Sequence, residues 1–355
     1  MALLWSDGFD HYGASVYMAP GAYTIATNTQ EEFVKTDPQR ARTGKGSLLV
    51  TTWNNNSAEL QKSLAPGVNF GFGFGLLILY GSPPSDIRSR INFGLASGGN
   101  WIFSVFPNPD FSIGFSLGLG TYNQAVASSA PGLLSQGYCW IEVRAFIDAA
   151  HGSIEIRVNG AVALLRTNLN LGNVPADNFH VLKANEVNSA WGAVYGYMDD
   201  LVLWDLTGQL NNDFFGSNTK CRTSYLASNL SQQDWIANGG IAYQVLGNVP
   251  PLTNSQNITG HNVGDVSAFG IQQFPTTISY ARGVTVFMQG NRTGQNPASF
   301  VPAIDIAGNK YFGSVVNPTQ TAGYYVATFE ADPITHSYWS LSDLNRATLE
   351  VDRTL

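Results

Sequence analysis

The chain has 355 residues, a net charge of −7 and an isoelectric point near 5.1, so it is long enough for two domains that each bury a core. The acidic balance excludes a protein that binds nucleic acid through the phosphate backbone, because such binding needs a basic surface. Hydrophobic residues make up an ordinary 44% of the chain, whereas charged residues make up 12%, about half the ~25% usual in globular domains.

The first part of the chain is predicted to consist of strands and turns. Residues 3–7 and 47–51 are typical strands, and residues 65–85 carry no charge. In that uncharged segment Phe70, Phe72 and Phe74 alternate with glycine, a period of two that indicates a strand, and the glycines would weaken a helix. We therefore expect no membrane span there. Further strands are expected at 90–94, 101–106 and 111–117.

The clearest pattern lies at residues 138–165. A strand is expected over 140–147, and Ile154, Ile156 and Val158 alternate up to Asn159-Gly160, after which the alternation resumes. Asn-Gly readily adopts positive φ, so it predicts a type I′ turn between two strands. With a closing strand at 193–205, residues 1–207 are predicted to form a two-sheet jelly roll.

The pattern restarts after a polar, turn-rich stretch at residues 207–213. Strands are expected at 284–288, 300–306, 324–330 and 348–351. Residues 342–347 are expected to form one helical turn, with Ser340 or Ser342 as its N-cap. Residues 208–355 are therefore predicted to be a second, smaller β-sandwich domain, which makes the whole chain all-β.

Several motifs resemble known proteins. The strand that starts at Trp140, the Asn159-Gly160 turn and the closing Asp199-Asp200 strand resemble a concanavalin A-like or laminin-G-like jelly roll. The first twelve residues, the junction at 199–216 and the tail at 325–345 resemble a group of tailed-bacteriophage virion structural proteins. The tail departs from that group after Thr335, where glycine is expected and His336 is found.

This resemblance implies a non-enzymatic virion protein that is assembled in the host cytoplasm. A tail fibre, the tail tip and a capsid decoration are all compatible with it. Its partners would be other virion proteins and further copies of itself, with a homotrimer suggested by analogy with virion appendages. A host-surface glycan is a further expected partner. The low charge favours a subunit embedded in an assembly, because a neutral surface is easily desolvated, although a monomer with an uncharged polar exterior fits the same composition.

Two alternatives share the lectin-like fold: a carbohydrate-binding module, which has no catalytic activity, and a glycan depolymerase, which is an enzyme. A retaining glycosidase needs two carboxylates about 5 to 5.5 Å apart. Glu142 and Glu155 are expected to be solvent-facing neighbours, and Asp199 and Asp200, being adjacent in a strand, are expected to point to opposite faces. No phosphate-cradling loop or nucleophile elbow occurs. We therefore predict no catalytic residues.

Bound ions and ligands are weakly indicated. The carboxylates that could bind calcium are Asp7, Asp10, Asp199, Asp200 and Asp205. We expect these side chains to cap turns instead, and we therefore predict no cofactor. The Cys139–Cys221 pair lacks metal-ligand spacing and is expected to stay unbridged.

Exposed aromatic side chains could stack on a sugar ring, but the sequence does not single out residues for this role. The tryptophans near turns are Trp53, Trp101, Trp191 and Trp235. The histidines are dispersed without metal-ligand spacing and are expected in loops or at the surface; they are His11, His151, His180, His261 and His336.

Overall fold

The computed structural model describes residues 3–12, 23–26, 34–37, 39–51, 58–80, 90–119, 125–135, 137–184, 194–247 and 257–355. The chain divides into two compact units, of which the first extends to Arg222 and the second starts at Thr223. The predicted boundary between residues 207 and 208 therefore lies earlier than the observed one. Among these residues, no helix is long and apolar enough to span a bilayer.

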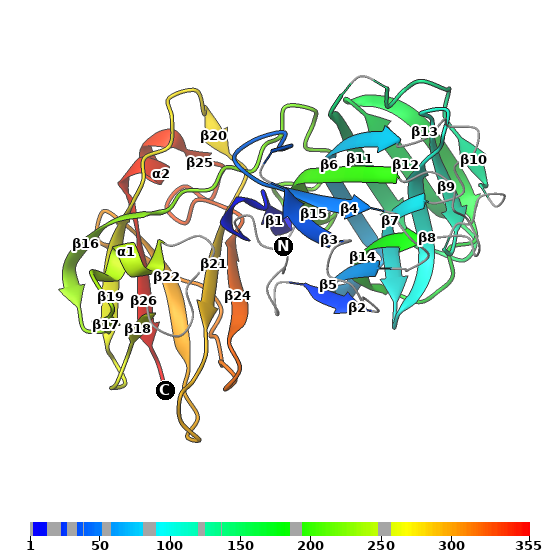
Figure 1. Ribbon diagram of the computed structural model, residues 1–355. Helices are drawn as coiled ribbons and strands as arrows, with labels where there is room; N and C mark the ends of the chain where they lie inside the picture. The colour runs from blue at the N-terminus through cyan, green and yellow to red at the C-terminus, as the bar shows by residue number, and fades with distance from the viewer. Residues whose placement is uncertain are drawn as a thin grey trace. The chain divides into compact units, whose positions relative to one another are not determined.

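The first domain consists of two antiparallel sheets (Figure 1). The sheet with eight described strands follows the spatial order β13 (Ala161–Leu169), β12 (Gly152–Val158), β11 (Cys139–Phe146), β6 (Asn69–Tyr80), β15 (Val194–Asp205), β4 (Ser47–Thr51) and β3 (Val34–Asp37), and β1 (Leu3–Asp7) also pairs with β15. A 3-10 turn, η1 (Asp10–Tyr12), follows β1.

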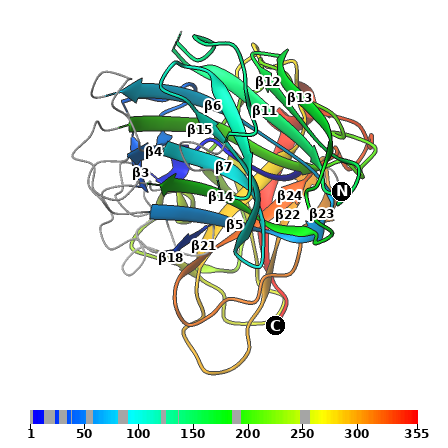
Figure 2. The same cartoon turned by 90° about the vertical axis from the view of Figure 1, so that its right-hand side faces the viewer.

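The sheet with seven described strands has the order β10 (Ala127–Ser128), β9 (Ile113–Leu117), β8 (Asn100–Pro107), β7 (Arg90–Ser97), β14 (Ala176–Ala184), β5 (Ala58–Gly67) and β2 (Thr24–Ala26). Figure 2 shows strands β5, β14 and β7 side by side. We call these two layers the eight-stranded and the seven-stranded sheet.

The core between the sheets is built from the phenylalanines of β6. Phe72 contacts Phe103 and Phe179 of the seven-stranded sheet, with ring centroids 6.3 and 5.0 Å apart, and Phe74 lies 4.4 Å from Phe93. The predicted period of two is thus confirmed, since all these rings are buried. Two packed antiparallel sheets give the first domain the predicted concanavalin A-like jelly-roll fold.

The alternating glycines of β6 leave room on the opposite face of that strand. A Cβ at Gly71 would overlap the ring of Trp204, and one at Gly75 would overlap the side chain of Arg42. At Gly73 a Cβ would lie 3.0 Å from the Trp140 ring. Glycine is therefore required here for close packing rather than for backbone flexibility.

The meander at residues 138–165 is confirmed. Strand β11 pairs with β12, and β12 pairs with β13. Both residues of the connecting turn have positive φ, 50° at Asn159 and 84° at Gly160, as a type I′ turn requires.

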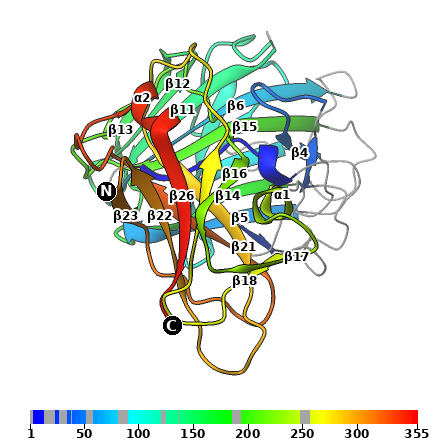
Figure 3. The same cartoon turned by 90° about the vertical axis from the view of Figure 1, so that its left-hand side faces the viewer.

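The second domain is also built from strands (Figure 3). Its largest described sheet has the order β16 (Leu226–Gln233), β19 (Val266–Ile271), β26 (Ala347–Arg353), β22 (Phe300–Ile306) and β23 (Asn309–Phe312). Three two-stranded ribbons accompany it: β17 (Ile236–Asn238) with β18 (Asn257–Thr259), β20 (Tyr280–Ala281) with β25 (Trp339–Ser340), and β21 (Val284–Gly290) with β24 (Gly323–Phe329).

The core of the second domain joins the β21–β24 ribbon to this sheet. Val286 of β21 packs with Ile304 and Ile306 of β22 and with the buried Trp339. Two short helices complete the domain: α1 (Ala242–Leu246), which was not predicted, and α2 (Leu341–Arg346). The predicted N-cap of α2 is confirmed, because the Ser340 hydroxyl accepts a hydrogen bond from the backbone N–H of Asp343.

Candidate functional site

The buried acidic pair Asp199–Asp200 lies on β15. The prediction that these adjacent residues point to opposite faces is wrong. The pairing of β15 with β6 is irregular between Asp199 and Val202, and Asp200 has a φ of 55°. A residue in the left-handed region interrupts the alternation of the strand. Both carboxylates consequently reach the same loop, which contains Arg42 and Thr43.

Protein donors surround both carboxylates. Asp199 accepts the backbone N–H groups of Arg42 and Thr43 at 2.7 and 2.8 Å. Asp200 accepts the Arg42 guanidinium at 2.7 Å and the Thr43 hydroxyl at 2.6 Å. Burial, together with the neighbouring charge of Asp200, raises the pKa of Asp199. Arg42, whose side chain is 13% exposed, is therefore the ion-pair partner of the fully buried Asp200.

The same residues attach the segment 208–222 to the jelly roll. The Arg42 guanidinium donates to the carbonyl oxygens of Ser217 and Thr219, at 2.7 and 2.6 Å. Asp200 accepts the backbone N–H of Cys221 at 2.6 Å. These bonds explain why the first unit extends to Arg222. We call residues 208–222 the anchored linker.

Glu142 provides a second attachment for the anchored linker. It is fully buried rather than solvent-facing, which corrects the prediction, and it accepts the backbone N–H groups of Phe215 and Gly216 at 2.5 and 3.0 Å. Burial raises the pKa of Glu142, although these two N–H donors oppose the shift. Glu155 instead forms ion pairs with Arg144 and Arg157, at 3.1 and 2.7 Å. The two glutamates thus serve different structural contacts.

The remaining calcium candidates also accept protein donors. The Asp7 carboxylate accepts the backbone N–H of Phe9 at 2.7 Å and the Tyr12 and Tyr23 hydroxyls at 3.0 and 2.9 Å. Asp10 accepts the backbone N–H of Lys45, and Asp205 accepts the backbone N–H and hydroxyl of Thr207. Asp7, Asp10, Asp199 and Asp205 therefore accept backbone N–H groups as expected, whereas Asp200 is mainly the ion-pair partner of Arg42. In the described part of the chain, no three His, Cys, Asp or Glu side chains are grouped as metal ligands.

A different set of polar residues lies on the face of the seven-stranded sheet that points away from the core. The strand registers align Ser116, Ser104, Gly94, His180 and Gln61 across five neighbouring strands. We call this surface the polar face. His180 is fully buried there, which corrects its predicted loop or surface position.

His180 forms a dyad with Glu59 of β5. The His180 Nδ1 and a Glu59 carboxylate oxygen are 2.5 Å apart. Burial, the largest single influence, raises the pKa of Glu59, but the interaction with His180 and the hydrogen bonds from Gln61 and Trp101 together outweigh it, so the pKa is lowered. The Trp101 ring packs edge-on against the imidazole, with centroids 5.2 Å apart. Trp101 occupies the space that Gly94 leaves open, since a Cβ there would lie 3.0 Å from its ring.

Three buried polar atoms on the polar face have no hydrogen-bond partner among the described residues. They are Nε2 of His180 and both amide atoms of Asn92. Asn92 lies two residues from Gly94 on β7 and pairs with Leu182 of β14, so it is a diagonal neighbour of His180. Buried polar groups are normally satisfied, and leaving one unsatisfied costs about 1–3 kcal/mol. The polar face is therefore the main candidate binding site of the first domain.

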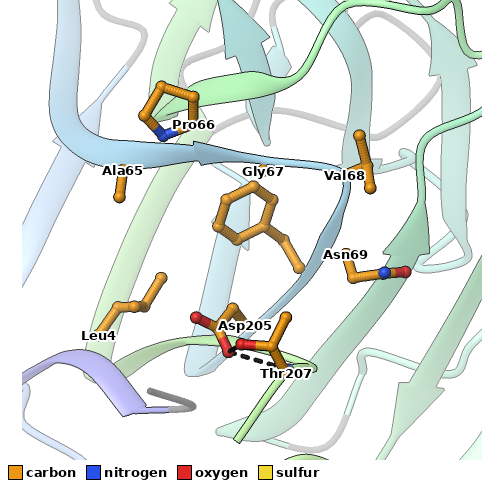
Figure 4. Close-up of a pocket in the computed structure, with 9 residues that line it drawn as sticks. Leu4, Ala65, Pro66, Gly67, Val68, Asn69, Asp205 and Thr207 are labelled. Carbon is orange, nitrogen blue, oxygen red and sulfur yellow. Dashed lines mark hydrogen bonds between the residues drawn. The ribbon is translucent and has the colours of Figure 1, made fainter.

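A separate pocket of about 310 Å³ opens where β5 meets β6 (Figure 4). Pro66, Val68 and Phe70 contribute apolar lining. Asp205 and Thr207 lie on the other side of the pocket from Pro66 and Val68 and are joined by a hydrogen bond. The single Asp205 carboxylate already caps its own turn, so the pocket offers one acidic group and little other polar chemistry.

The other predicted site residues are dispersed. Trp53 and Trp191 lie outside the described residues, and Trp235 of the second domain donates its Nε1–H to the carbonyl of Asp265 at 3.0 Å. The remaining histidines do not join the polar face. Cys139 and Cys221 are free thiols, as predicted. The Glu59–His180–Trp101 group was not predicted, because its members come from three strands far apart in the sequence.

No protein-family model and no curated protein sequence matches this chain. Among solved structures, the chain is similar to an endo-β-1,4-glucuronan lyase from the fungus Trichoderma reesei, with 12% identity over 57% of this chain and 95% of that chain (TM-score 0.39). It is also similar to the Emp47p carbohydrate recognition domain, with 13% identity over 57% and 97% (TM-score 0.39). A third similar structure is the CBM2 module of the evolved Dit of Lactobacillus casei BL23 phage J-1, with 12% identity over 60% and 98% (TM-score 0.36).

Proposed function

We propose that the chain is a non-enzymatic structural protein of a bacteriophage virion, either in a tail fibre or tail tip or as a capsid decoration. Other virion proteins and further copies of the chain would be its assembly partners, with a trimer as the expected homo-oligomer. The protein is assembled in the host cytoplasm and acts in the particle, where its lectin-like domain contacts the host surface.

The structural role of the buried acids is the observation that carries this proposal. Asp200 and Glu142 are fully buried in the first domain and accept backbone N–H groups of the anchored linker, so neither belongs to an exposed carboxylate pair of the kind that glycoside hydrolysis uses. An acid whose oxygens accept backbone N–H groups is a fixed part of the scaffold. The sequence motifs at both ends of the chain and at its junction support the virion assignment independently.

Virion membership is tested by immunogold labelling of purified particles, with an antibody against the second domain. Labelling at regular positions on the tail or capsid is expected. Particles that contain no copy of the chain by mass spectrometry would overturn the proposal. Native mass spectrometry of the free protein adds the oligomeric state, and a strict monomer with tight sugar binding would instead favour a free carbohydrate-binding module.

A glycan depolymerase is the second candidate function, and the Glu59–His180 dyad favours it. A carboxylate that holds Nδ1 of a histidine leaves Nε2 able to accept a proton, which is the arrangement of a general base. Incubation of the wild-type chain and the His180→Ala variant with capsular polysaccharides tests this alternative. Release of new reducing ends by the wild type alone would establish the enzyme and contradict the structural role.

A further inference from the structure

The pocket between β5 and β6 holds one acidic group inside an apolar enclosure. Its volume of about 310 Å³ lies at the lower end of the range of about 300–1,000 Å³ that ligand pockets span, so it suits a single side chain. Pro66, Val68 and Phe70 supply apolar lining, and Asp205 is the only ionisable residue among the described residues that line the pocket. The occupant should therefore have an apolar stem and one polar end.

The Asp205 carboxylate keeps one oxygen for such an occupant. The backbone N–H and the hydroxyl of Thr207 both bind the same oxygen, Oδ1, at 2.9 and 2.7 Å. Figure 4 shows the other oxygen of Asp205 turned away from Thr207. Within the described part of the chain, no Lys, Arg or His side chain forms an ion pair with Asp205. A carboxylate without a counter-charge beside an apolar pocket attracts a cation.

The chemistry of the pocket selects an alkylammonium group among the cations. A calcium ion takes about six to eight oxygen ligands, whereas the lining presents one carboxylate with one oxygen already engaged. A guanidinium binds best to both oxygens of a carboxylate, and Thr207 occupies Oδ1. The ammonium of a lysine is a point charge that needs one oxygen, and its methylene stem packs against apolar walls. A lysine side chain therefore fits best.

Two exposed apolar side chains lie beside the pocket, and we call them the apolar rim. Val68 is 40% exposed, and Phe146, whose backbone pairs with Asn69 of the pocket lining, is 36% exposed. The backbone N–H of Ile147 donates to the carbonyl of Val68 at 2.8 Å, so the two rim residues come from neighbouring segments. A pocket for one anchoring side chain, next to apolar contact surface, is typical of an interface between proteins.

The lysines of this chain do not match the apolar rim. Among the lysines whose side chains the structure describes, the exposed ones are Lys45, Lys220 and Lys310. Lys45 lies between two glycines and Lys220 follows a threonine and precedes a cysteine, so neither has large apolar neighbours in sequence. Lys310 is already paired with Glu350 at 2.6 Å. A different protein is therefore the better source of the lysine.

We propose that this pocket anchors the chain to another virion protein by taking up one lysine side chain of that protein, whose apolar neighbours contact Val68 and Phe146. The ammonium binds Oδ2 of Asp205, and the methylene stem packs against Phe70 and Pro66. This inference rests on the proposed assembly role of the chain and specifies the chemistry of one partner contact.

Methyl NMR of the full-length chain tests the pocket, because Leu4 and Val68 both carry methyl groups and line it. The probe is the capped peptide acetyl-Leu-Lys-Leu-amide. The comparison peptide carries norleucine in place of lysine, which keeps the stem and removes the charge. Both peptides should shift the Leu4 and Val68 signals, and the lysine peptide should bind at least about fivefold more tightly. Salt at about 1 M should remove that preference, because it screens the ion pair.

Substitution of Asp205 by asparagine isolates the charge. Asp205→Asn keeps an oxygen that can accept the Thr207 donors, so the melting temperature should change little, but the preference for the lysine peptide should disappear. Asp110→Asn is the matched control. Asp110 accepts the backbone N–H and hydroxyl of Ser112 in the same way, at 3.0 and 2.7 Å, and is not part of the pocket lining. This variant should keep the preference.

Several outcomes would overturn the inference. They are the absence of shifts at Leu4 and Val68, equal binding of the two peptides, and a preference for lysine that survives in Asp205→Asn. A homo-oligomer that dissociates in Asp205→Asn but not in Asp110→Asn would place a second copy of the chain in the pocket instead. Immunogold labelling of particles does not depend on peptide binding, so a failed peptide assay and a failed virion assignment can be told apart.

Discussion

The left-handed backbone at His336 permits a sharp test of local strain. This residue has a φ of 54°, its side chain is exposed, and its backbone N–H donates to the carbonyl of Asp332 at 2.8 Å. A residue with a Cβ pays about 1–2 kcal/mol for this conformation, whereas glycine adopts it freely. Glycine is the residue that we expected after Thr335, and the positive φ supplies a physical reason for that expectation.

Replacement of His336 by glycine should therefore stabilise the second domain. Relief of about 1–2 kcal/mol is partly offset by the larger entropy of glycine in the unfolded chain, about 0.4–1 kcal/mol. A net gain of about 1 kcal/mol should raise the melting temperature by about 3 °C for a domain of this size. Differential scanning calorimetry of the full-length chain measures the shift.

The His336→Ala variant is the matched control. Alanine removes the imidazole but keeps the Cβ, so it should melt close to the wild type and below the glycine variant. At an ordinary exposed position the order is reversed, because glycine costs stability relative to alanine. An alanine variant that is more stable than the glycine variant would refute the left-handed conformation as a source of strain.

Three further predictions concern the first domain. Gly71→Ala should lower the free energy of unfolding by about 1–3 kcal/mol, because the added Cβ overlaps the Trp204 ring. Gly290→Ala, whose added Cβ has no neighbour closer than 3.7 Å, should change that free energy little. Urea titrations measure both variants, and equal effects would contradict the packing of β6. Asp200→Asn should cost about 3 kcal/mol, since it leaves the Arg42 guanidinium buried without its counter-charge, and a loss below about 1 kcal/mol would show that water reaches the pair. Burial lowers the pKa of Lys62 to about 8. Between pH 8 and 10.5 the unfolded chain therefore binds more protons than the native chain, so the free energy of unfolding should rise with pH. Lys62→Met should remove that rise, and the same pH dependence in wild type and variant would contradict the lowered pKa.

The repeating patterns of the chain predicted its strands well. The alternation of phenylalanine and glycine in β6 and the Asn159-Gly160 turn both depend on near neighbours, and both are found in the structure. The N-cap at Ser340 was predictable for the same reason. Local sequence suffices where the physical cause lies within a few residues.

The candidate site could not be predicted, because its causes are distant in sequence. Glu59 and His180 meet only through the pairing of β5 with β14, and no spacing rule connects them. The convergence of Asp199 and Asp200 depends on one left-handed residue that a strand pattern does not reveal. The anchored linker looked like an interdomain boundary because it is polar, yet its backbone is held by Glu142 and Arg42.

The anchored linker also determines how the first domain would respond to mechanical tension. Strand β15, which precedes the linker, lies between β6 and β4 in the interior of its sheet. A pull applied through residue 223 would first have to rupture the bonds at Cys221, Thr219 and Ser217 before it could peel β15. These hydrogen bonds, which involve the charged groups of Asp200 and Arg42, would break first when force is applied to the second domain, and the sheets of the jelly roll would stay folded.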